Sequence, residues 1–203
     1  MPKKLGDLQK QLDKKRLSRR TKMDRIIHLI ERDKLRLEAL ECTRKLNLPQ
    51  CYLAAGFVRN LVWDHLHHKS ISTPLNDVDV IYFDPNELNR DKYKEYERAL
   101  NALMPQLNWQ VRNQAFMHLR NADQPYKSSL DAMSYWPEKE TAVAIRKLES
   151  GNLECIAAFG FESLFSLQIT YNPKRLRETF ECRVKSKGWL ELWPGLSIAP
   201  LTH

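Results

Sequence analysis

The sequence lacks long apolar runs, closely spaced cysteines and low-complexity linkers. No stretch of about 18 consecutive apolar residues occurs, so neither a membrane span nor a membrane partner is expected. The first residues, Met-Pro-Lys-Lys, are basic but are not followed by the apolar stretch of a secretory signal. No Cys-x-x-Cys pair is present, which argues against zinc and favours reduced thiols in a cytoplasmic protein, at Cys42, Cys51, Cys155 and Cys182.

Positive charge is concentrated at the start of the chain. The formal net charge is +8, and residues 1–25 contain ten lysines and arginines against three aspartates, which accounts for +7 of it. We predict a basic helical tail over residues 1–22 and a single domain over residues 23–203. The tail could contact nucleic acid, because clustered lysine and arginine side chains attract phosphate. A solvated, partly frayed helix without a partner is the simpler alternative.

The rest of the chain mixes strand and helix signals. Two apolar runs flank the turn Glu-Ser-Gly-Asn and predict a hairpin at 141–148 and 153–159. Further strand signals lie at 53–55, 77–83 and 109–118. Helical spacing predicts helices at 3–20, 23–30, 35–46, 56–68, 90–104, 161–169 and from Asn172 onward. The predicted fold class is therefore α+β, a small mixed β-sheet of about five strands with helices on one side and an N-terminal helical extension.

Two aspartates stand at alternate positions of one apolar strand. Side chains alternate faces along a strand, so Asp77 and Asp79 are expected to point to the same side. Their Cα atoms should lie roughly 6–7 Å apart, which lets both carboxylates bind one divalent ion or a pair. Two like charges side by side repel, and this favours a cation between them. An exposed polar strand edge is the alternative interpretation.

A glycine connects the preceding apolar strand to a helix. Gly56 follows the run Leu-Ala-Ala, and Arg59 falls in the first helical turn. Glycine allows the backbone to come close to a bound group, and the N-terminus of a helix attracts phosphate. A guanidinium there can make forked contacts with phosphate oxygens. Asn60 either orients a phosphate oxygen or caps its own helix. Together with the acid pair, this pattern predicts phosphoryl or nucleotidyl transfer.

These motifs resemble elements of the tRNA nucleotidyltransferases, members of the polymerase β-like nucleotidyltransferase superfamily. Ala-Gly-Phe-Val-Arg-Asn at 55–60 is similar to their Gly-Gly-x-Val-Arg-Asp, and Asp-Val-Asp at 77–79 to their Asp-x-Asp. A bacterial nucleotidyltransferase-like family is similar over most of residues 34–200. The resemblance implies a sheet of the nucleotidyltransferase type within residues 23–203. It also implies nucleotide phosphates at Gly56 and Arg59, and Mg²⁺ (or Mn²⁺) at Asp77 and Asp79.

Three features depart from the tRNA enzymes. Ala55 stands in place of their first glycine, and Asn60 in place of their aspartate. The superfamily often carries a third carboxylate on a later strand, whereas the corresponding strand 109–118 offers cationic and amide side chains. Asp131 and Glu154 are the remaining candidates for this third acid, and a solvent-facing charge is the alternative at each position.

The sequence thus predicts Mg²⁺-dependent transfer of an NMP from an NTP to an acceptor hydroxyl, with RNA as one candidate acceptor. Asp77 and Asp79 are the predicted catalytic and metal-binding residues, and the predicted nucleotide-binding residues are Gly56, Arg59, Asn60 and Asn113. Asn113 and His118 are considered because the long strand could carry them to the acceptor side. Two alternatives stay open: a catalytically degenerate protein that binds a nucleotide or RNA, and a toxin-like transferase that modifies tRNA or protein.

Overall fold

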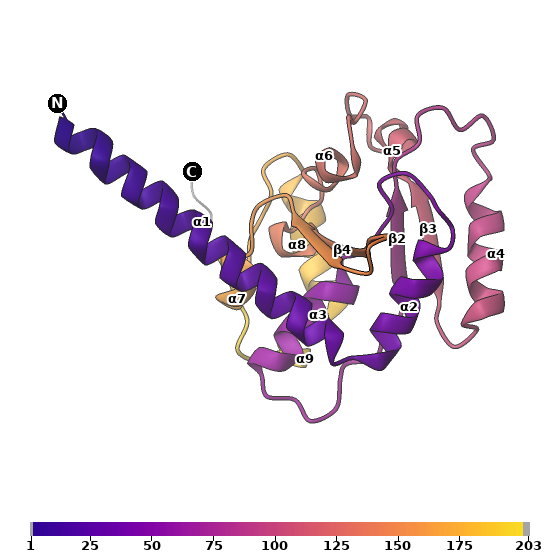
Figure 1. Ribbon diagram of the computed structural model, residues 1–203, viewed down its shortest axis with the longest axis horizontal. Coiled ribbons are helices and arrows are strands. Elements are labelled where there is room, and N and C mark those ends of the chain that lie inside the picture. Colours follow the sequence, from indigo (N-terminus) through magenta and orange to yellow (C-terminus); the bar gives the residue numbers. More distant parts are fainter. Residues whose placement is uncertain (1, 201–203) are drawn as a thin grey trace.

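The computed structural model describes the backbone of residues 2–200 and the side chains of residues 14–200 (Figure 1). The tail charges predicted within residues 1–13 lie outside the described side chains. The helices are α1 Pro2–Glu31, α2 Lys34–Arg44, α3 Gly56–Leu66, α4 Tyr93–Leu103, α5 Gln114–Asn121, α6 Ser129–Met133, α7 Glu162–Phe165, α8 Arg177–Lys187 and α9 Trp189–Leu192. The strands are β1 Tyr52–Ala54, β2 Val78–Tyr82, β3 Trp109–Asn113, β4 Val143–Lys147, β5 Leu153–Ala157, β6 Gln168–Ile169 and β7 Ser197–Ile198.

The first five strands form one mixed sheet in the order β3-β2-β1-β4-β5. Strands β2 and β3 are parallel because α4 carries the chain back between them, and the other neighbouring pairs are antiparallel. The hairpin of β4 and β5 confirms the strongest turn prediction. The α+β class and the five-stranded mixed sheet are likewise confirmed.

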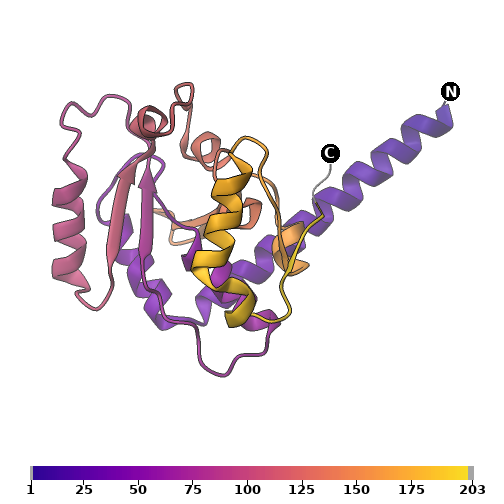
Figure 2. The same cartoon turned by 180° about the vertical axis from the view of Figure 1, so that it is seen from behind.

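The two faces of the sheet are covered differently. Apolar side chains on one face, such as Leu53 and Val80, join a large core with α1, α2, α3 and α4. The other face has small side chains, including Ala54 and Ala144, and Met133 of α6 packs against them. The prediction of helices on one side only is therefore wrong. Helix α2 lies in front in Figure 1, whereas α8 lies in front in the reverse view of Figure 2.

Local capping groups explain where several helices begin. Helix α1 runs without a break through the predicted 22/23 boundary and ends where expected. The Asp33 carboxylate accepts a hydrogen bond of 3.0 Å from the Arg36 amide and so caps α2. Asn113 similarly caps α5, so strand β3 stops there and the prediction of a strand to residue 118 is wrong. Within residues 2–200, no helix has the length and apolarity needed to cross a membrane.

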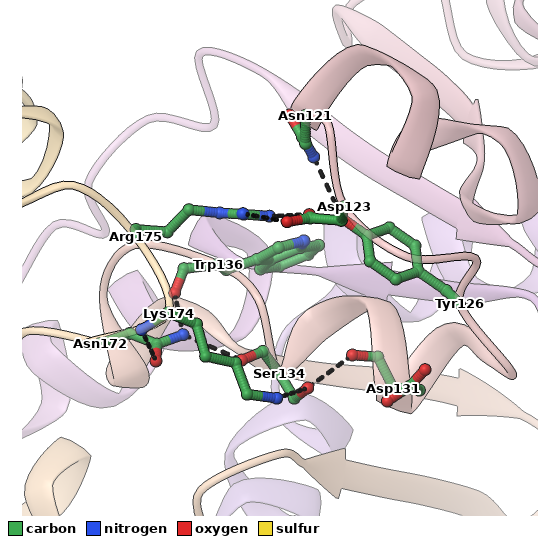
Figure 3. A network of polar contacts seen from close by, with 9 residues as sticks. All are labelled: Asn121, Asp123, Tyr126, Asp131, Ser134, Trp136, Asn172, Lys174 and Arg175. Atoms are coloured by element: carbon green, nitrogen blue, oxygen red, sulfur yellow. Dashed lines mark hydrogen bonds and ion pairs between the residues drawn. The ribbon is translucent and has the colours of Figure 1, made fainter.

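Two C-terminal predictions also need correction. The segment 161–169 contains only the short helix α7, and the chain then enters β6. Asn172 does not start the last helix, because its buried side chain donates hydrogen bonds to the carbonyls of Ser134 and Trp136 at 2.9 and 2.7 Å (Figure 3). Helix α8 begins at Arg177 instead. A buried amide with two acceptors ties this loop to the end of α6.

Candidate functional site

The acid pair lies at the start of the central strand β2. Asp79 stands between the fully buried Val78 and Val80, so its side chain faces the opposite side of the sheet from the main core. Asp77 is exposed and immediately precedes the strand. Their charges interact, because Asp77 contributes to raising the pKa of Asp79. The two aspartates thus interact electrostatically, and that both point to one side of the sheet stays a prediction.

The charge of Asp79 is poorly compensated by the protein. Burial, and next the negative charge of Asp77, raise the pKa of the Asp79 carboxyl group. The positive charges of Arg59, Lys187 and Arg183 oppose the rise. No hydrogen bond from a described residue contributes to the shift. A half-buried carboxylate without a donor, next to a second carboxylate, fits a hard divalent cation that prefers oxygen ligands.

The described residues offer two carboxylates to such a cation. Within the described part of the chain, no three histidine, cysteine or acidic side chains gather closely enough to hold a metal ion. Mg²⁺ commonly binds one or two carboxylates and completes its shell with water and substrate phosphates. The donor set thus fits Mg²⁺ or Mn²⁺ that is shared with a phosphorylated substrate.

Asn108 holds Asp77 in place. Its side-chain Nδ2 donates a 2.6 Å hydrogen bond to Asp77 Oδ1, and its carbonyl accepts a 2.8 Å hydrogen bond from the Val78 amide. This leaves the second oxygen of Asp77 available for a ligand. The sequence alone could not identify Asn108, because its position beside Asp77 depends on the parallel register of β2 and β3.

The glycine turn lies next to the acid pair. Ala54 of β1 is the direct cross-strand partner of Asp79, and Gly56 follows two residues later at the start of α3. A Cβ atom added at Gly56 would lie 3.3 Å from Asn60 Nδ2 and 3.5 Å from Arg59 Nη2. The missing side chain therefore opens the space between the turn and these two donors. The structure brings Gly56, Arg59 and Asn60 together as predicted from their spacing.

Arg59 is a buried cation within an aromatic and polar cage. Its guanidinium carbon lies 4.4 Å from the ring centroid of Trp189 and 5.1 Å from that of Trp63. Nη1 donates to Thr141 Oγ1 at 2.7 Å and Nη2 to Asn60 Oδ1 at 3.0 Å, whereas Nε has no partner among the described residues. Burial lowers the pKa of Arg59 to about 10, so the group stays protonated at neutral pH. A buried cation without a bonded carboxylate favours an anion near the turn.

Helix α8 adds further positive charge on this side. Arg183 and Lys187 are four residues apart and so lie on one face of the helix. Arg183 Nε donates a 2.6 Å hydrogen bond to the carboxylate of Glu138, which is 1% exposed. Both cations act on the pKa of Asp79. The spacing of 183 and 187 was visible in the sequence, but nothing there related this helix to β2.

Asn113 does not join this group of residues. It points to the main-core face of β3, and its side chain is fully used within the fold. Its Oδ1 accepts hydrogen bonds from the amides of Asp84 and Ala115, and its Nδ2 donates to the Asp84 carbonyl and to Glu87. His118 lies on α5 and bonds the Ala115 carbonyl. Neither side chain is held beside the acid pair.

The two candidates for a third carboxylate are engaged elsewhere. Glu154 lies on β5, three strands from β2 and hence about 14 Å away across the sheet. It accepts hydrogen bonds from Tyr52 and Arg146 at 2.9 and 2.6 Å. Asp131 accepts a 2.9 Å hydrogen bond from the Lys127 amide at the start of α6, where Figure 3 shows it beside Ser134. The described residues thus provide two acids at the site.

Comparison with known proteins gives a consistent family assignment. A sequence model of the nucleotidyltransferase family matches residues 41–198. An NMR structure described as a CCA-adding enzyme head domain is 32% identical, with a TM-score of 0.77 over 87% of this chain and 95% of that chain. A search of curated protein sequences gives no match.

Larger enzymes share the fold at lower identity. A CCA-adding enzyme in complex with CTP is 15% identical, with a TM-score of 0.58 over 88% of this chain but only 43% of its own length. A CCA-adding enzyme in complex with ATP is 14% identical, with a TM-score of 0.50 over 80% of this chain and 38% of its own. The shared fold agrees with the family model and with the more similar head domain. On these grounds the chain belongs to the nucleotidyltransferase family.

Proposed function

We propose that the protein is a metal-dependent nucleotidyltransferase that moves an NMP from an NTP to an acceptor hydroxyl. One observation carries the proposal: strand pairing sets Asp79 directly beside Ala54, two residues before the glycine that opens α3. A helix N-terminus suited to phosphate thus lies next to a carboxylate pair suited to a metal ion. Nucleotidyl transfer needs both groups around one triphosphate.

Some of these residues would bind the metal ion, and others would bind the phosphates of the NTP. Asp77 and Asp79 would hold Mg²⁺ or Mn²⁺, which when bound supplies charge stabilisation at the α-phosphate and lowers the pKa of the attacking hydroxyl. The free backbone N–H groups at the start of α3, beginning with that of Gly56, would bind phosphate oxygens. Asn60 Nδ2, which faces the space left by the glycine, would donate to one of these oxygens.

The cations stabilise the leaving group. The acceptor hydroxyl loses its proton to solvent and its oxygen forms a bond to the α-phosphorus, while the bond between that phosphorus and the bridging oxygen breaks, so negative charge develops on pyrophosphate. Arg59 lies behind the turn with a fixed orientation, and Arg183 and Lys187 stand on α8. A preorganised cation stabilises developing charge without reorganising at the moment of reaction.

An NTP is the proposed donor and RNA is one candidate acceptor. Enzymes of the same fold were solved with CTP and with ATP, which supports an NTP here without specifying the base.

All four cysteines lie among the described residues and none forms a disulfide, which supports the proposed cytoplasmic location.

A catalytically degenerate nucleotide-binding protein is the second candidate. Its support is that the described residues supply two acids but no third one at the site. This alternative expects nucleotide binding without release of pyrophosphate. It therefore differs from the first proposal in a product that can be measured.

Transfer of label from each of the four NTPs tests the proposal. With Mg²⁺ or Mn²⁺ and total RNA as acceptor, Asp77→Asn and Asp79→Asn should each lower transfer more than about 100-fold, because even groups behind metal ligands contribute 10- to 100-fold. Asp91→Asn is the matched control, since Asp91 is exposed and pairs with Lys94 on the surface. Transfer that persists undiminished in both site variants contradicts the mechanism. Metal-dependent NTP binding without pyrophosphate release from the wild type supports the degenerate alternative.

A further inference from the structure

We propose that α1, together with the groove where it meets α3, forms a binding surface for the RNA that carries the acceptor hydroxyl. The inference rests on the proposed function for the chemistry, but RNA binding itself can be measured without it. Three features carry the inference: an unneutralised run of cations, the rigid projection of α1 from the domain, and a cationic groove at its base.

The described half of α1 is densely positive and exposed. Between residues 14 and 25 the chain has seven lysines and arginines and one acid, Asp24. All are exposed except Lys22, which is half-buried and contacts Glu162 at 3.5 Å. No other salt bridge is found for these cations among the described side chains. These like charges repel one another, and binding a polyanion relieves that repulsion most directly.

The helix holds these charges in a fixed place. Ile26 and Ile30, near its end, are 0% exposed within the main core, and residues of α1 contact α2, α3 and β5. Upstream of this anchor, α1 projects away from the domain as one continuous helix (Figures 1 and 2). At about 1.5 Å per residue, residues 2–22 extend roughly 30 Å. A rod of this length can contact a polymer that a compact domain alone would not reach.

A groove at the base of α1 continues the positive surface. It has a volume of about 620 Å³ and is lined by Arg25, His28 and Arg32 of α1 and the following turn, and by His65 of α3. Asp24 is the acidic side chain that faces it. Burial, followed by the charges of Arg25, His68 and Arg32, lowers the pKa of His65. The positive charge of this open groove therefore comes from Arg25 and Arg32, which suits a phosphate, and His65 adds a ring nitrogen to its lining.

The arrangement of the cations favours RNA over a membrane surface. At about 100° per residue, the six cations from Lys14 to Lys22 spread over roughly 240° of the helix circumference. A helix that lies in a membrane surface needs one broad apolar face, but Leu17 is the apolar residue exposed in this stretch, at 68%. Charges on several sides instead suit a polyanion that follows the helix. RNA also supplies the hydroxyl that the proposed chemistry requires.

The position of the groove suits a long acceptor. His65 stands nine residues after Gly56 on α3, so the groove and the phosphate-binding end of this helix are about 14 Å apart. A molecule that contacts both places must extend at least this far. An RNA chain is long enough to do so, with its body on α1 and its terminal hydroxyl near Asp79.

Fluorescence anisotropy with a labelled 30-nucleotide hairpin RNA tests this surface, using the full chain without NTP. Arg19→Gln with Arg20→Gln should weaken binding by roughly 10-fold or more at about 100 mM salt and lower the slope of log K against log salt by between 1 and 2. Lys94→Gln with Arg98→Gln on the exposed face of α4 is the matched control and should stay within about twofold of the wild type. Circular dichroism checks that both double variants keep their helix content.

Two further arms separate the possible failures. Asp79→Asn should bind the hairpin as well as the wild type, so a loss of transfer in that variant with intact RNA binding concerns the catalytic proposal alone. Equal RNA affinity in the α1 variant and the α4 control overturns the RNA surface, whatever the activity. Stronger binding of the wild type to phosphatidylserine vesicles than to the hairpin, with loss in the same α1 variant, overturns it in favour of a membrane.

Discussion

Ala55 shows how a single residue can keep a glycine-type turn. It has φ 55° and ψ −120°, a combination that favours glycine, and glycine is the residue that the tRNA enzymes have at this place. Its amide donates to the Val143 carbonyl at 2.9 Å, and its carbonyl accepts from the amides of Val58 and Arg59. These bonds hold an alanine in a conformation that costs about 1–3 kcal/mol. The departure noted in the sequence therefore leaves the turn intact.

Glycine substitutions should separate strain from packing at this turn. Ala55→Gly relieves the positive φ but loses one buried methyl, so we expect a free energy of unfolding between unchanged and about 1 kcal/mol higher. Ala54→Gly removes a methyl from a buried, unstrained strand position and should cost about 1–2 kcal/mol. Urea unfolding measures both variants. An equal loss of stability in the two would contradict the assignment of strain to Ala55.

The sequence could predict candidate site residues that are close together in the chain, but it could not predict their partners from distant parts of the chain. Asp77, Asp79, Gly56 and Arg59 follow from alternation and turn chemistry within one short stretch. Asn108 could not be predicted in this way, because its hydrogen bond to Asp77 depends on which strand lies beside β2. The same limit applies to the cations of α8, whose approach depends on the path of the whole C-terminal segment.

At the scale of elements, the sequence predicted the existence of strands and helices better than their ends. The alternation of Trp109, Val111 and Asn113 correctly indicates a strand, but the side chain of Asn113 then accepts the Ala115 amide and starts a helix. A short polar side chain that caps a helix resembles a polar strand residue in sequence. Asn172 is the reverse case, because the residue expected to start a helix has its side chain buried as a link between loops.

A forked ion pair joins the loop after α5 to the loop before α8. Arg175 donates to the two carboxylate oxygens of Asp123 at 2.8 and 2.6 Å, and Figure 3 shows the two side chains aligned. The hydrogen bond from Arg175 is the main cause that lowers the pKa of Asp123 below its ordinary value of 3.8. The pair therefore stabilises the fold above about pH 3.8, and this stabilisation is lost as the pH falls through the lower folded-state pKa.

Asp123→Asn should lower the free energy of unfolding by about 1–3 kcal/mol at neutral pH, since charge-assisted hydrogen bonds contribute about this much. The difference from the wild type should be constant between about pH 5 and 8 and should shrink below about pH 4. Chemical unfolding across this pH range measures it. Asp91→Asn, which breaks an exposed pair with Lys94, is the control and should cost less than about 1 kcal/mol. A difference that grows as the pH falls would show that the pair does not act in this way.

At the scale of the whole molecule, the site is assembled from distant parts of the chain. The C-terminal segment returns to α3, where Trp193 donates a 2.8 Å hydrogen bond to the buried Asp64, and Trp189 covers Arg59. The residues of the cage come from α3, the turn before β4 and α9, so the orientation of Arg59 depends on the complete fold rather than on the local motif.

The measurement that tests the central claim most directly is thermal unfolding with each NTP, with and without Mg²⁺ or Mn²⁺. An NTP with metal should raise the melting temperature of the wild type by more than either does alone, because a ligand at about 100 times its Kd adds roughly 2.7 kcal/mol of stability. Asp79→Asn should be at least as stable as the wild type without ligand, since it removes a half-buried charge repelled by Asp77. It should also lose the metal-dependent part of the shift. A wild type that shows no metal-dependent shift with any of the four NTPs, or an Asp79→Asn variant that shifts equally, would contradict a single site formed by the acid pair and the glycine turn.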